Sequence, residues 1–138
     1  MSATLLYTSE VLGLATSLSQ YPWNDALPLK GGARSKSCGS TVELALSVDA
    51  DGRIDTVALK AQACAIGQAA AAIFAGAAKG RNAQQVHDAA QAIEDWLAGT
   101  GEMPAWPGLP AIAAARDYPA RHGAIMLAWK AANELLPT

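Results

Sequence analysis

Two alternating segments joined by a tight turn constrain the fold of this chain more than any other feature. Apolar residues occupy every second position from Val42 to Val48, and residues 54–61 form a second segment of strand type. Strict alternation is typical of half-buried strands. The intervening Asp49-Ala50-Asp51-Gly52 has the composition of a turn. We therefore predict an antiparallel hairpin with one buried face.

The rest of the chain is dominated by helical patterns. Residues 65–78 are almost all Ala, Ile, Phe and Gly, which predicts a helix buried around most of its circumference. Asn82 is a candidate N-cap and Gly99 a stop for a further helix. We also predict helices over 9–20, with Ser9 as N-cap, and over about 120–136, a brief helix over 111–116, and an irregular or edge-strand connector over 21–37. The expected fold class is α+β, a small antiparallel sheet packed against a layer of helices.

Length and charge narrow the possible classes of function. With 138 residues we expect one domain over residues 1–138. Twelve acidic against ten basic side chains give a net charge of −2, which disfavours a nucleic-acid partner. No uncharged apolar run approaches the ~20 residues that span a bilayer. The chain starts without a basic signal region, so we expect a cytoplasmic protein with no membrane partner.

The two cysteines of the chain flank the predicted hairpin. Cys38 precedes the first strand, and Cys64 follows the return strand directly before the alanine-rich helix. Because antiparallel pairing brings these two positions to the same sheet edge, we expect the thiols to lie side by side. In a reducing compartment they are expected to stay free. Two thiolates alone do not complete a zinc site, which takes at least three protein ligands.

Three motifs give the chain a family resemblance. They are Ser-Cys-Gly-Ser before a strand, Cys-Ala-Ile-Gly opening an alanine-rich helix, and Tyr-Pro-Ala-Arg-His-Gly-Ala-Ile-Met-Leu-Ala-Trp near the C-terminus. Together they resemble the U-type iron–sulfur scaffolds, namely IscU, SufU and the N-terminal module of NifU, from about Leu5 onward. A Trp-Pro-Gly-Leu segment lies where the SufU branch carries an insertion, which makes that branch the closer match. The resemblance implies a SufE/NifU-like two-layer fold and a cysteine desulfurase as partner.

The resemblance also implies a site, and this chain departs from it at two positions. Family members hold zinc or a nascent iron–sulfur cluster on three cysteines and a nearby aspartate. Cys38 and Cys64 match the first two cysteines, but Ser40 stands at the aspartate position and Ala124 at the third cysteine. The resemblance therefore implies that a cluster or zinc is bound weakly or not at all.

For several residues near this site, the sequence allows more than one role. His122 could complete a metal site with Cys38 and Cys64, but on a helix it points about 200° away from Ala124, which favours a solvent-facing or capping role. Arg121 is either an anion- or partner-binding residue or a member of a surface salt bridge. The cysteines themselves could be small buried apolar residues.

The resulting hypothesis is a divergent iron–sulfur scaffold or sulfur-acceptor protein with no turnover of its own, in which Cys38 and Cys64 accept sulfur as persulfides. A helix N-terminus beside Cys64 would favour the reactive thiolate. The alternative is a pseudo-scaffold that docks a desulfurase or cluster carrier without assembling clusters. We expect a monomer or weak homodimer, and four thiolates from two copies would be another route to a complete site.

Overall fold

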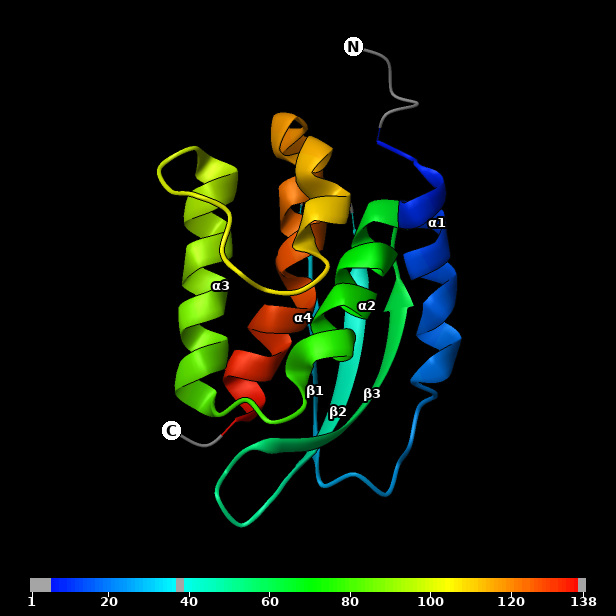
Figure 1. Ribbon diagram of the computed structural model, residues 1–138. Coiled ribbons are helices and arrows are strands. Elements are labelled where there is room, and N and C mark those ends of the chain that lie inside the picture. Colours follow the sequence, from blue (N-terminus) through cyan, green and yellow to red (C-terminus); the bar gives the residue numbers. More distant parts are fainter. Residues whose placement is uncertain (1–5, 37–38, 137–138) are drawn as a thin grey trace.

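A computed structural model describes residues 6–36 and 39–136 (Figure 1). Three strands form one antiparallel sheet in the order β1-β2-β3, and the other regular elements of the described residues are helices. The elements, with η for a 3-10 helix, are α1 (Ser9–Thr16), η2 (Ser17–Gln20), β1 (Leu29–Arg34), β2 (Thr41–Val48), β3 (Ile54–Gln62), α2 (Ala65–Ala78), α3 (Ala83–Ala98), η3 (Leu109–Asp117), η4 (Pro119–Arg121) and α4 (His122–Leu135).

The predicted hairpin is confirmed as β2 and β3. Its register pairs Thr41 with Gln62 at one end, and the strands are joined through a turn in which Asp49 N donates to Arg53 O at 2.8 Å. Gly52 has a φ of 77°, a left-handed conformation that suits glycine. The connector before the hairpin contains β1, which pairs with β2 as an edge strand.

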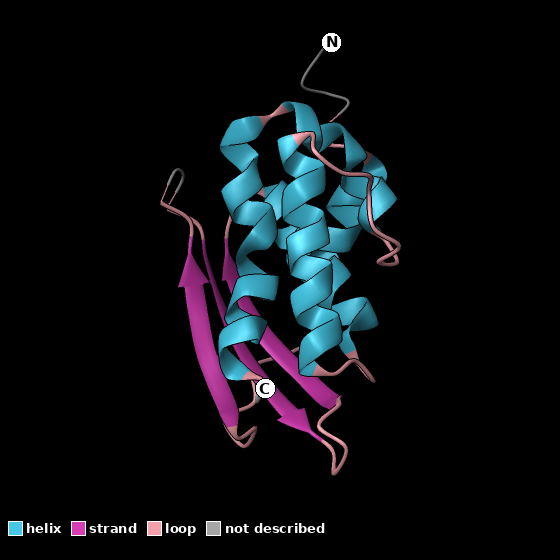
Figure 2. Cartoon of the chain, turned by 90° about the vertical axis from the view of Figure 1, so that its left-hand side faces the viewer, coloured by secondary structure: helices cyan, strands magenta, loops and turns pink. Residues whose placement is uncertain are grey.

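The sheet and the helices form two layers, as the α+β prediction required (Figure 2). The inward side chains of β2, such as Leu44 and Leu46, are fully buried and belong to the same core cluster as the helices. On the outer face of the sheet, Ala45 and Ala58 form a small separate cluster with Leu27, and Trp23 packs against it. One face of the sheet therefore carries the core and the other remains largely open.

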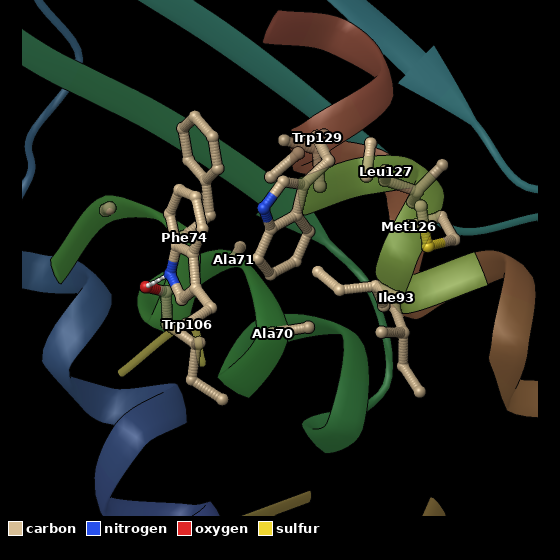
Figure 3. Close-up of a cluster of buried hydrophobic side chains, with 14 of the residues drawn as sticks. Ala70, Ala71, Phe74, Ile93, Trp106, Met126, Leu127 and Trp129 are labelled. Carbon is tan, nitrogen blue, oxygen red and sulfur yellow. Dashed lines mark hydrogen bonds between the residues drawn. The ribbon is translucent and has the colours of Figure 1, made fainter. Parts of the chain in front are cut away.

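An aromatic cluster of Phe74, Trp106 and Trp129 fixes the middle of the helical layer (Figure 3). Phe74 and Trp106 stack with ring centroids 5.7 Å apart, and Trp129 stands nearly perpendicular to both rings. Trp106 Nε1 donates to Ile73 O of α2 at 2.9 Å, which anchors the long connection between α3 and η3. Trp96, Trp106 and Trp129 are all buried in the core.

The helix boundaries show where local sequence signals failed. Thr8, not Ser9, caps α1, because its Oγ1 accepts a hydrogen bond from Val11 N. The helix predicted over 9–20 changes to 3-10 geometry after Thr16, where the hydroxyls of Thr16 and Ser17 bond back to carbonyls three residues earlier and compete with the helical ladder.

The last two predicted helices also begin differently. The brief helix over 111–116 is the 3-10 helix η3, and the final α-helix starts at His122, after the 3-10 turn η4. Proline occupies the first turn of both 3-10 segments. The alanine-rich helix and the helix from Asn82 to Gly99 match their predictions, the latter with a complete capping box between Asn82 and Gln85.

Candidate functional site

The connection between β1 and β2 lies at the same end of the sheet as the start of α2. Arg34 pairs with Thr41, and Thr41 pairs with Gln62, so the chain leaves β1, enters β2 and leaves β3 at the same end of the sheet. We call this end of the molecule, with the first turns of α2 and α4, the thiol edge. Cys38 lies outside the described residues, and its predicted proximity to Cys64 therefore stays a prediction.

Two backbone hydrogen bonds close the loop that joins β1 to β2. Ser35 N donates to Ser40 O at 2.8 Å, and Gly39 N donates to Ser35 O at 3.0 Å. Gly39 adopts a left-handed φ of 71°. Ser35 and Ser40 are both buried, so the residue at the family's aspartate position lies inside the loop. The basic residues Arg34 and Lys36 beside it are exposed.

Cys64 is a half-buried free thiol at the N-cap position of α2. Its backbone is extended, with φ −62° and ψ 168°, and its carbonyl accepts the first helical hydrogen bond, from Gln68 N at 2.9 Å. The side chain makes no capping hydrogen bond. The thiol therefore lies at the positive end of a 14-residue helix and is not completely enclosed by the core.

Ala124 packs against the first turn of α2. A Cβ atom built on Gly67 would lie 3.2 Å from Ala124 Cβ and 2.8 Å from Ala63 Cβ. Ala124 is 1% exposed. The position that matches the family's third cysteine is therefore a close contact between two helices, and its methyl group offers no ligand atom.

Arg121 and His122 begin α4 at this edge, and both have hydrogen-bond partners. Arg121 Nη2 donates to Tyr7 Oη at 3.1 Å, which ties the N-terminal segment to the start of α4. His122 Nε2 lies 2.8 Å from Arg116 O. A carbonyl only accepts, so Nε2 carries the proton and Nδ1 is the nitrogen that remains for a metal. A role for His122 as third ligand stays a prediction.

Among residues 6–36 and 39–136, no group of three His, Cys, Asp or Glu side chains is close enough to hold a metal ion. The described residues alone therefore do not build the metal site of the resemblance. In the same part of the chain, no helix is both long and apolar enough to cross a membrane.

Sequence reasoning missed two contributors to this edge, Tyr7 and Gln68. Gln68 Nε2 donates to Ala63 O at 2.8 Å. Its only sequence signal is that a polar side chain interrupts an apolar helix four residues after Cys64. Nothing local in the sequence indicated the contact of Tyr7 with Arg121. Trp23 packs on the outer sheet face, with Lys60 Nζ 4.7 Å from its ring centroid.

A two-layer domain with a thiol at the junction of sheet and helix fits one known family. The chain matches the NifU-like N terminal domain over residues 20–124 and belongs to this family. None of the curated proteins compared with the chain is significantly similar to it in sequence.

Solved structures support the same assignment. A nitrogen-fixing NifU-like protein (N-terminal) from Brucella abortus superposes with a TM-score of 0.86 at 27% identity, covering 95% of this chain and 92% of that one. A putative iron–sulfur cluster assembly scaffold protein for the SUF system from Fervidobacterium islandicum gives a TM-score of 0.84 at 20% identity, covering 99% and 100%. At this identity the second likeness concerns the fold.

Proposed function

We propose that this protein is a divergent member of the iron–sulfur assembly system that accepts sulfur on Cys64 and Cys38. The observation that carries the proposal is the half-buried thiol of Cys64 at the N-terminus of α2, at the sheet edge to which the Cys38 loop connects. Membership of the NifU-like family supports a role as a scaffold. The expected partner is a cysteine desulfurase.

The transfer step needs only a thiolate and a persulfide donor. The Cys64 thiolate attacks the terminal sulfur of a persulfide on the desulfurase cysteine. A new S–S bond forms on Cys64 while the donor S–S bond breaks, and the electron pair leaves with the donor sulfur as a thiolate. The chain gains one sulfur atom, and no external oxidant is required.

Stable metal binding would need ligands that this chain lacks at two of the positions implied by the resemblance. Ala124 provides no donor atom, and the carboxylate of the family site is replaced by Ser40. Zinc held by Cys38 and Cys64 would need His122 through Nδ1, or water, to complete its coordination. We therefore infer that an iron–sulfur cluster or zinc is cargo held only transiently at this edge.

The test is intact-mass measurement after incubation with a cysteine desulfurase and cysteine. The wild-type protein should gain the mass of one or more sulfur atoms, whereas Cys38→Ala and Cys64→Ala should each show which thiol carries it. A three-cysteine homologue serves as positive control for the desulfurase. If that homologue is modified and all three forms of this protein keep their mass, sulfur acceptance is wrong.

The contact between Gly67 and Ala124 favours a second candidate, the pseudo-scaffold. A packed methyl group in place of the third ligand suits a protein that keeps the family surface but assembles nothing. Desulfurase binding without any mass gain would support this candidate. Metal analysis of untagged protein purified without chelator adds a further test, because one ion per two chains would indicate a site shared between copies.

A further inference from the structure

Gln68 is the one residue of α2 with a polar side chain, and it does not point into solvent as an ordinary surface glutamine would. Its Nε2 reaches back over the first turn of the helix and donates to Ala63 O at 2.8 Å. The bond is partly buried. Because Ala63 C=O belongs to the peptide group that carries Cys64 N, this bond holds the peptide immediately before the thiol residue.

A second contact holds the same residue from the other side. Ala63 Cβ approaches so closely that a Cβ on Gly67 would lie 2.8 Å from it. Ala63 is therefore folded onto the first turn of α2, and glycine at position 67 permits this approach. The Cys64 side chain makes no capping hydrogen bond and packs against the edge of the core, so the Gln68 bond is the polar contact that holds the peptide before it.

We propose that Gln68 is a positioning residue for the Cys64 thiol. Its amide fixes the 63–64 peptide so that the half-buried free thiol stays at the N-terminus of α2. The biological meaning of this role rests on the proposed sulfur transfer. The positioning itself can be measured without any desulfurase.

The experiment uses the full chain with Cys38→Ser, which leaves Cys64 as its only thiol. Gln68→Met keeps the length of the side chain but removes the donor, and Gln68→Glu removes the donor while keeping an oxygen. The matched control is Gln91→Met, because Gln91 is an exposed glutamine of α3 whose Nε2 donates to Asp95. Thermal unfolding of each variant shows that it is folded.

Two readouts report on Cys64 directly. The first is the NMR order parameter of the Cys64 amide, which should fall from the rigid range of about 0.85 in both Gln68 variants. The second is the second-order rate of Cys64 with an aromatic disulfide, which should fall about two- to fivefold in Gln68→Met because the rate depends on how the thiol is presented to its reagent. Gln91→Met should change neither.

An unchanged order parameter, or an equal or faster thiol reaction in Gln68→Met, overturns the positioning role. Persulfide transfer from a desulfurase is then measured on the same variants. Where wild type accepts sulfur, Gln68→Met should slow the transfer without weakening desulfurase binding. Where wild type accepts none, the proposed function fails, while the amide and thiol measurements still decide the role of Gln68.

Discussion

The contact between α2 and α4 differs sharply between its middle and its N-terminal end. The two helices run side by side in the same direction (Figure 1). Gly67 lies next to Ala124 near the start of both helices, and Phe74 lies next to Trp129 further along both. The middle is filled by large aromatic rings and anchored by the Trp106 hydrogen bond. Among the described residues, the end is made of alanine and glycine beside the Cys64 thiol.

This difference indicates that the fold and the chemistry depend on separate parts of one interface. The aromatic cluster buries large apolar surfaces, which is the dominant source of folding free energy. At the thiol edge, an alanine packs well against glycine, so replacing a ligand there leaves the helix contact intact. The chain keeps the fold of a NifU-like relative closely, with a TM-score of 0.86, although it has alanine at the position that the resemblance assigns to the third cysteine.

The prediction with the largest expected effect removes the Trp129 ring from the middle of the contact between α2 and α4. Trp129 is fully buried, so Trp129→Ala should lower the free energy of unfolding by about 3–5 kcal/mol, from lost burial and the cavity left behind. Chemical denaturation followed by circular dichroism measures this loss. The matched control is Trp23→Ala on the outer sheet face, where the ring is only partly buried and a much smaller loss is expected. Equal losses would contradict the assignment of the aromatic cluster as the main support.

The second test rebuilds the thiol edge and leaves the middle untouched. Ala124→Cys with Ser40→Asp restores the family's three cysteines and aspartate, and each anionic ligand replaces a weakly held water. Zinc affinity should rise at least about a hundredfold, equivalent to about 2.8 kcal/mol. Competition with a chromophoric chelator measures it.

The control for this rebuilding is Ala124→Ser with Ser40→Asn, which adds atoms of similar size without thiolate or carboxylate. It should bind zinc no better than wild type. If the restored double variant also binds no better, either other residues already complete the wild-type site or position 124 does not face the cysteines.

Much of the fold was predictable because its signals are local. Alternation over the hairpin, the alanine-rich run of α2 and the Asn82 capping box each depend on residues within a few positions of one another. The 3-10 turn after α1 and the Thr8 cap were not predicted, because the hydroxyls of Thr8, Thr16 and Ser17 can each bond to several nearby backbone groups of similar energy.

The site was predictable only as far as strand pairing determines it. The hairpin register places the residues after β3 beside those before β2, which located Cys64 and its edge. The hydrogen bonds of Arg121 and His122 were not predicted. The Tyr7–Arg121 bond joins residues 114 positions apart, and no periodicity or cap signal reports such a contact.

The hydrogen bond between Arg121 and Tyr7 gives the prediction with the smallest expected effect on stability. A partly buried hydrogen bond to a charged group contributes about 1.5–3 kcal/mol at most, and solvent contact at this edge should reduce the coupling to about 1 kcal/mol. Tyr7→Phe, Arg121→Gln and the double variant form a cycle that isolates this coupling in unfolding free energy.

The control is Tyr118→Phe, because Tyr118 is another half-buried tyrosine near the start of α4. It should show no coupling with Arg121→Gln. Additive losses for Tyr7 and Arg121 would mean that the N-terminal segment does not hold the start of α4. A measured coupling would show that the Tyr7–Arg121 bond holds the N-terminal segment to the start of α4.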